Sequence, residues 1–243
     1  MLRRITSFGN GALVSNHSER IVSIPESADL THSPTDMRVD WIRANAVAAL
    51  VSFVLGVATF GLRQMLGLPD PEAGVFARGM QGLAEVIAAV AGFAVYGVRT
   101  GAVLQRKLPS FPPLTWQTLH ILMGLAVGIV VASLELQAVS APRENLTPSI
   151  LSITVGGMMI GAFMGAATGA LQALVLRKAA REVGDWIRWS ALAGTTLGGY
   201  ALALGIGSDQ PLRDEVLIQL LGFAIAIASG IVMLPALLRL RPH

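Results

Sequence analysis

Glu85 is the most conspicuous ionisable side chain of the sequence, because it stands inside a long apolar segment, in Gln81-Gly-Leu-Ala-Glu85. A carboxylate at membrane depth is destabilising by several kcal/mol unless it is paired, hydrated or protonated. The sequence therefore leaves two interpretations open. Glu85 is a proton or cation site, or it lies near the outer interface, where it is hydrated or bonded to Gln81 and to Arg78 on the same helix face.

His120 is the second candidate for chemistry, one helical turn after Trp116. A neutral imidazole can ligate the metal of a chlorophyll or a haem. No second histidine falls in an apolar segment, which excludes a bis-histidine haem. The alternative is an interfacial histidine that is bonded to a backbone carbonyl or to water.

Motifs of known catalytic sites are missing from the sequence. It has no Gly-rich phosphate loop, no Gly-x-Ser-x-Gly and no His-Glu-x-x-His, and its 243 residues include no cysteine. We therefore expect neither an enzyme nor a metal site. Interhelical hydrogen bonds, rather than catalysis, are the expected role of the amides and hydroxyls Gln117, Gln172, Gln219, Thr168, Thr195 and Thr196.

The elements that carry these residues are long apolar segments. Hydrophobic residues make up 53% of the chain and charged residues only 14%, whereas average globular domains have about 25% charged residues. The composition predicts an all-α, multi-pass membrane protein. Six spans are expected, at about residues 42–62, 79–104, 116–136, 149–176, 186–206 and 216–238.

The distribution of the 18 basic residues predicts the orientation of these spans. Most of them fall in the tail and in the loops on one side, which the positive-inside rule assigns to the cytoplasm. We therefore expect a bacterial cytoplasmic-membrane protein with both termini in the cytoplasm. Residues 1–40 are expected to form a polar cytoplasmic tail, and residues 41–243 the six-helix transmembrane domain. Because the basic clusters lie at helix ends, they indicate contact with lipids and no binding of nucleic acid.

Glycines recur every fourth residue on several of the predicted helices, as in a glycine zipper. Such faces let another helix backbone approach closely in a bilayer. These faces predict contacts among the six spans, or, alternatively, a docking face for a partner helix or another protomer. The residues are Gly157, Gly161, Gly165 and Gly169, then Gly124 and Gly128, Gly194 and Gly198, and Gly97 and Gly101.

The odd-numbered spans each open with a tryptophan: Trp41, Trp116 and Trp186. Two of the three stand in the same tetrapeptide, Asp-Trp-Ile-Arg, and the even-numbered spans end in basic residues. A repeat of about 70 residues, each copy one helical hairpin, accounts for this pattern. Membrane anchoring alone is the alternative, because tryptophans and basic residues gather at interfaces.

One pattern extends over the fourth and fifth spans. It reads Gly165-x3-Gly169-x2-Gln172-x3-Leu176-Arg177-x8-Trp186-x7-Gly194. This pattern resembles one seen in uncharacterised bacterial multi-pass membrane proteins, a resemblance that implies no activity. Substrate-binding components of vitamin transporters are an alternative family, since they also have six spans and small-residue faces such as Ala44-x3-Ala48.

The sequence leads to three functional hypotheses. Glycine-lined faces, few intramembrane ionisable groups and a polar tail indicate a non-catalytic accessory subunit that packs against other membrane subunits or a second copy of itself. The first alternative is a small-solute or ion transporter or channel component that uses Glu85. The second alternative is a protein associated with chlorophyll or haem through His120.

Overall fold

The computed structural model of the chain describes residues 34–68, 74–137, 150–196 and 213–243. Four long helices come first: α1 (Pro34–Met65), α2 (Val75–Lys107), α3 (Pro113–Gln137) and α4 (Ile150–Leu176). Then follow β1 (Ala180–Arg181), α5 (Gly184–Gly194), α7 (Arg213–Val232), α8 (Leu234–Arg239) and β2 (Arg241–Pro242). The described residues are mostly helical, as the sequence predicts.

Five of the described helical segments are long and apolar enough to cross a membrane. Large apolar side chains along them are exposed, such as Ile160 at 62% and Phe163 at 73% on α4. Such exposure is expected where lipid, not water, surrounds the helices. The five segments are Thr35–Met65, Val75–Lys107, Pro113–Ser133, Val155–Leu176 and Gln219–Arg239. The fifth predicted span is described only through α5, and its remainder lies outside the described residues.

Prolines mark several helix starts. Pro34 and Pro113 are the first residues of α1 and α3, and Pro235 lies in the first turn of α8. Proline is tolerated there because the first N–H groups of a helix have no intrahelical acceptor. Pro235 also explains why the sixth predicted span is divided into α7 and α8 at Met233.

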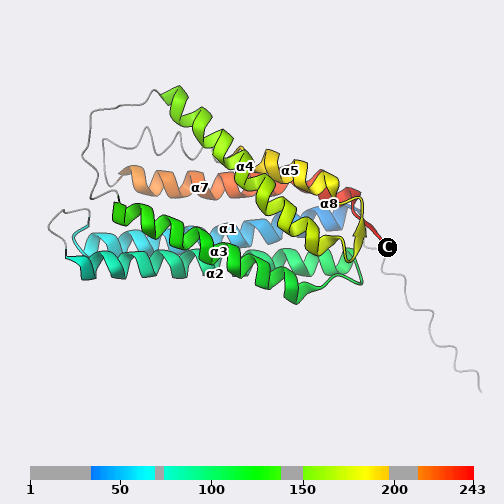
Figure 1. The fold of residues 1–243 in the computed structure, drawn as a ribbon, viewed down its shortest axis with the longest axis horizontal. Helices are drawn as coiled ribbons and strands as arrows, with labels where there is room; N and C mark the ends of the chain where they lie inside the picture. Colours follow the sequence, from blue (N-terminus) through cyan, green and yellow to red (C-terminus); the bar gives the residue numbers. More distant parts are fainter. Residues whose placement is uncertain (1–33, 69–73, 138–149, 197–212) are drawn as a thin grey trace, which may run out of the picture. The chain divides into compact units, whose positions relative to one another are not determined.

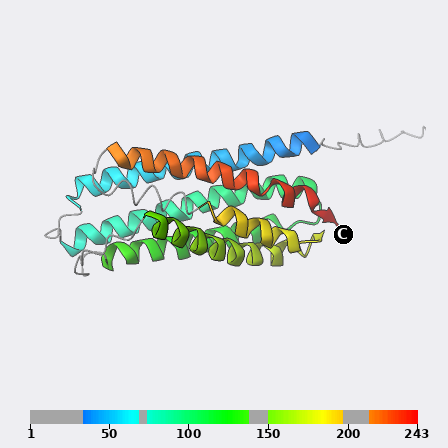
Figure 2. The same ribbon diagram turned by 90° about the horizontal axis from the view of Figure 1, so that it is seen from above.

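The long helices lie side by side in one bundle (Figures 1 and 2). The most extensive packing joins α2 to α3 and α4 to α5, while α1 packs on both α2 and α7. Smaller contacts between α3 and α4 and between α5 and α7 close the ring. Two of the closest pairs, α2/α3 and α4/α5, join an even-numbered span to the span that follows it, which differs from the grouping within each predicted hairpin. The pair α1/α2, which is the first predicted hairpin, also packs more extensively than α1/α7.

One end of the bundle gathers the starts of α1 and α5 and the ends of α2 and α8. Asp40 and Arg106 form an ion pair of 2.6 Å there, and Asp185 and Arg239 form another of 2.6 Å. At the same end β1 pairs with β2 in antiparallel register, with Arg181 opposite Arg241. This end therefore carries many of the basic residues that the sequence assigns to one side of the membrane.

Candidate functional site

Trp41, Trp116 and Trp186 pack together in the interior of the bundle and are called the tryptophan layer here. Each indole is at most 1% exposed. Trp186 lies between the other two, with ring centroids 6.0 Å from each and edge-to-face geometry. Such aromatic pairs stabilise by about 0.5–1.5 kcal/mol beyond the burial of their area. The tryptophans therefore form a packed core and do not lie as separate anchors on the lipid-facing surface.

Each indole N–H of the tryptophan layer donates to a neighbouring helix. Trp116 Nε1 donates to Thr100 Oγ1 on α2 (3.0 Å), and Trp41 Nε1 donates to the carbonyl of Gly230 on α7 (2.9 Å). Trp186 Nε1 donates to Gln172 Oε1 on α4 (2.8 Å). Each tryptophan thus fixes its own helix to one neighbour, which gives the pairs α2/α3, α4/α5 and α7/α1.

Gln172 also fixes the tautomer of His120. Because its Oε1 accepts from Trp186, its Nε2 is the group that faces His120 Nε2, at 3.0 Å. An amide nitrogen only donates, so His120 Nε2 is the unprotonated ring nitrogen. His120 Nδ1 then carries the proton and donates to the carbonyl of Trp116 (2.7 Å).

His120 therefore uses both ring nitrogens in bonds within the protein. It is fully buried, at 0% exposure, and its ring lies 5.0 Å from that of Tyr96. A pigment metal would have to displace the Gln172 amide to reach the lone pair on His120 Nε2. The geometry suits the alternative in which His120 bonds to a backbone carbonyl.

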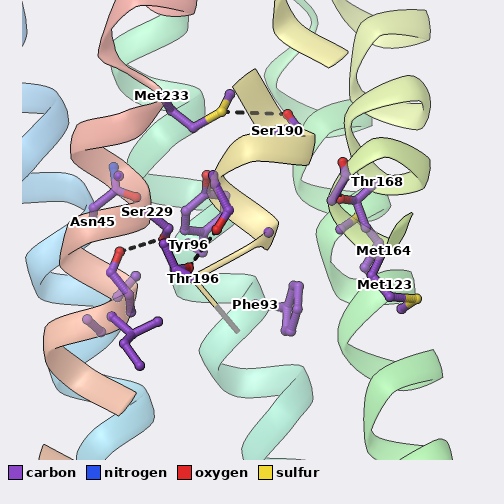
Figure 3. Close-up of a pocket in the computed structure, with 18 of the residues that line it drawn as sticks. Asn45, Phe93, Tyr96, Met123, Met164, Thr168, Ser190, Thr196, Ser229 and Met233 are labelled. Atoms are coloured by element: carbon purple, nitrogen blue, oxygen red, sulfur yellow. Dashed lines mark hydrogen bonds between the residues drawn. The ribbon is translucent and has the colours of Figure 1, made fainter. Parts of the chain in front are cut away.

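A cavity of about 530 Å³ begins next to the tryptophan layer and extends between the helices. It is bounded by α1, α2, α3, α4, α5 and α7 (Figure 3), and none of the described residues that line it is charged. Its volume falls in the range of about 300–1,000 Å³ that is typical of small-molecule sites. The apolar lining includes Ala48, Phe93, Met123, Met164, Ile225 and Met233.

Several polar side chains at the cavity have hydrogen-bonding capacity that other described residues do not use, among them Asn45, Tyr96 and Ser190. Asn45 donates through Nδ2 to the Trp41 carbonyl (2.8 Å), but its Oδ1 accepts no bond from the described residues. The Tyr96 hydroxyl has no described partner either, and the Ser190 hydroxyl contacts only the Met233 sulfur, at 3.6 Å. A thioether is a weak acceptor. These groups give an otherwise apolar cavity a few points for polar recognition.

The glycines of α4 pack against α5 of the same chain. A Cβ on Gly165 would meet the backbone carbonyl of Ser190, and one on Gly194 would meet the backbone of Gly161. A Cβ on Gly169 would lie 2.5 Å from the Ser190 side chain. This face is therefore occupied within the chain. Gly157 is partly buried on α4, and Gly198 lies outside the described residues.

The glycines of α2 and α3 form a second seam. A Cβ on Gly124 would lie 2.9 Å from Val90, and one on Gly128 would lie 2.7 Å from Val86. On the other side of the same contact, a Cβ on Gly97 would stand 3.0 Å from His120. These faces, too, are used for packing between helices of one chain.

Glu85 lies on α2, away from the cavity lining. Its Oε1 accepts a hydrogen bond of 2.8 Å from Gln81 Nε2 one turn earlier, as one of the two sequence interpretations expects. Neither Glu85, Gln81 nor Arg78 is among the described residues that line the cavity. The structure thus does not place this candidate ion site at the cavity.

Hydrogen bonding of the other polar residues divides by type. The predicted interhelical role is confirmed for Gln172, which joins α4 to α3 and α5. Among the described residues, the hydroxyls of Thr168, Thr195 and Thr196 instead donate locally, each to the carbonyl three residues earlier. Short hydroxyl side chains reach their own backbone more easily than a neighbouring helix.

Asn45, Tyr96 and Ser190 were not singled out from the sequence. For Asn45 and Ser190 a signal was present, since each follows a tryptophan by four residues, as His120 does. Tyr96 carries no comparable signal. Four residues is about one helical turn, so these side chains stand directly beyond the tryptophan layer.

Comparisons of the chain with protein-family models, with curated proteins and with solved structures find no match. The chemistry of the cavity therefore carries the functional argument. Five residues of the Gly165–Gly194 pattern lie in the α4/α5 contact that borders this cavity: Gly165, Gly169, Gln172, Trp186 and Gly194.

Proposed function

We propose that the chain is a six-span membrane protein, with both termini in the cytoplasm of a bacterium, that binds a small uncharged solute as a component of a transport system. The observation that carries this proposal is the cavity of about 530 Å³, to which six helices contribute lining residues and whose described lining holds no charge. An ion would lack a counter-charge in such a lining, whereas an uncharged, mainly apolar molecule can replace lipid or water there.

The proposal keeps the solute-binding part of the transporter hypothesis and gives up the role of Glu85. That carboxylate is bonded to Gln81 on the outer part of α2, and it does not line the cavity. The solute is therefore recognised by apolar contacts and by a few hydrogen-bonding groups instead of by ion pairing.

The accessory-subunit hypothesis stays a prediction. Two of the observations that favoured it in the sequence now support it less. The glycine faces of α4 and α3 are covered by α5 and α2 of the same chain, and most of the polar tail lies outside the described residues. Contact with a larger assembly is compatible with solute binding and would then use other surfaces.

Native mass spectrometry of the purified full chain tests the proposal. We expect a co-purifying small molecule in the unmodified protein and its loss in Thr168→Phe, since Thr168 lines the cavity and a phenyl ring would fill it. The matched control is Leu174→Phe on the same helix, because Leu174 is 57% exposed on the outside. Equal occupancy in the two variants, or no bound molecule in the unmodified protein under gentle extraction, would overturn the proposal.

A further inference from the structure

The residue four positions after each tryptophan of the layer has the same surroundings in all three helix pairs. It packs against a glycine of the helix with which that tryptophan forms its hydrogen bond. The three contacts are Asn45 with Gly230, His120 with Gly97, and Ser190 with Gly169. The position is polar in every pair, but its residue type differs from pair to pair.

The spacing beyond each of these glycines is also the same. A leucine follows each glycine by seven residues, and all three leucines are 0% exposed: Leu104, Leu176 and Leu237. The residue three positions after each glycine differs, being Thr100, Gln172 or Met233. Tryptophan, glycine and leucine are thus constant in the three pairs. The residue types vary at two positions, four residues after the tryptophan and three residues after the glycine.

We infer that the pairs α7/α1, α2/α3 and α4/α5 are repeats of one unit around the cavity, and that Asn45 and Ser190 are specificity-determining residues for its solute. The inference rests on the proposed solute-binding function. Three identical units would give a cavity with threefold symmetry. Asn45, His120 and Ser190 all line the cavity, and because their residue types differ, the lining is not threefold symmetric. A solute that itself lacks threefold symmetry needs such an asymmetric lining.

The three equivalent positions differ in what they offer to a solute. His120 has no nitrogen to spare, because it bonds to the Trp116 carbonyl and to Gln172, and it therefore acts as a positioning residue. Asn45 presents an acceptor, Oδ1, and Ser190 presents a hydroxyl whose described partner is a thioether sulfur. Figure 3 shows both residues at the cavity together with Tyr96.

The chemistry of these groups defines the class of solute. It is uncharged and mainly apolar, and it carries one group that both donates and accepts a hydrogen bond, such as a hydroxyl or a secondary amide. That group donates to Asn45 Oδ1 and accepts from the hydroxyl of Ser190 or Tyr96. A buried donor or acceptor gains most from a partner where water is excluded.

Three probes that share one ring system test this inference: naphthalene, 2-methoxynaphthalene and 2-naphthol. Their binding to the full chain is measured by equilibrium dialysis, and binding that persists in Thr168→Phe is subtracted as partition into detergent. We expect 2-naphthol to bind about 3- to 10-fold more tightly than naphthalene, the factor that one net hydrogen bond provides. We expect 2-methoxynaphthalene, which cannot donate, to bind less tightly than 2-naphthol.

Ser190→Ala and Asn45→Leu should each reduce the preference for 2-naphthol, measured as the ratio of the naphthalene and 2-naphthol dissociation constants. Ser133→Ala is the control, because Ser133 is exposed on α3 and bonds to its own helix. Ser190→Ala removes one oxygen only, so it keeps the test valid if Asn45→Leu does not fold. Naphthalene binding without any preference for 2-naphthol would overturn the inference alone. If none of the three probes shows binding that is lost in Thr168→Phe, the proposed function itself is overturned.

Discussion

His120 Nε2 and Gln172 Nε2 lie 3.0 Å apart, and this contact joins α3 to α4 across the cavity end of the bundle. Packing between these two helices is otherwise small. Gln172 extends the connection to α5 through the indole of Trp186. A single amide thus connects three helices where the cavity meets the tryptophan layer.

Replacing this amide should therefore destabilise the bundle. In Gln172→Leu the buried His120 Nε2 and Trp186 Nε1 both lose their partner, and each unsatisfied group costs about 1–3 kcal/mol. We expect the free energy of unfolding to fall by about 2 kcal/mol or more. Unfolding in mixed micelles, followed by tryptophan fluorescence, measures the change.

Gln105→Leu is the matched control, because Gln105 is an exposed glutamine near the end of α2. Its replacement should change stability by no more than about 0.5 kcal/mol. Equal effects of the two substitutions would show that the Gln172 amide has no stabilising role.

The same hydrogen bonds predict the tautomer of His120. Nitrogen-15 NMR of the labelled chain at neutral pH should show a histidine with protonated Nδ1 and unprotonated Nε2, and this signal should disappear in His120→Asn. Nε2 must accept from Gln172, whose Oε1 is already engaged by Trp186. A proton on Nε2 would contradict the arrangement of this network.

Much of the architecture could be predicted from the sequence, because hydrophobic length alone determines it. The five long apolar helices fall where the runs of apolar residues are, and the last one is divided at Pro235. The three tryptophans were also recognised as related. Their position could not be predicted, because interfacial anchors and buried rings have the same sequence pattern.

The cavity could not be predicted, because it depends on which helices become neighbours. Gly165 and Gly194 both read as packing positions, yet only the structure shows that they meet each other across α4 and α5. Asn45 and Ser190 become equivalent only once each is seen against a glycine from a distant part of the chain. Spacing along one helix carries no information about the partner helix.

Gly165 should not tolerate a methyl group. In Gly165→Ala the new Cβ would meet the Ser190 carbonyl, so α4 and α5 must separate, and we expect a loss of about 1–3 kcal/mol. Gly156→Ala on the same helix is the control, since a Cβ there has no neighbour within 4 Å. Alanine favours a helix over glycine by up to about 1 kcal/mol, so Gly156→Ala should be neutral or stabilising. Equal destabilisation by the two alanines would contradict the described α4/α5 contact.

The ion pair between Asp185 and Arg239 should contribute little, despite its 2.6 Å separation. Its side chains are 29% and 60% exposed, and exposed pairs contribute about 0–1 kcal/mol. Asp185→Asn should therefore lower the free energy of unfolding by less than Gln172→Leu does in the same assay. A larger loss would indicate that the pair lies in a medium less polar than its exposure suggests.

The absence of cysteine makes the predicted orientation directly testable, because single cysteines can be introduced without background labelling. In intact cells we expect a membrane-impermeant maleimide to label Gly67→Cys, in the turn after α1, and Ser208→Cys, which the sequence places after the fifth span. Lys178→Cys and Arg241→Cys should react only after the cells are opened. Lys178 follows α4 and Arg241 belongs to β2, at the end of the bundle that the basic residues assign to the cytoplasm. Labelling of Ser208→Cys only in opened cells would mean that the fifth segment does not cross, and the chain would then have five spans and termini on opposite sides.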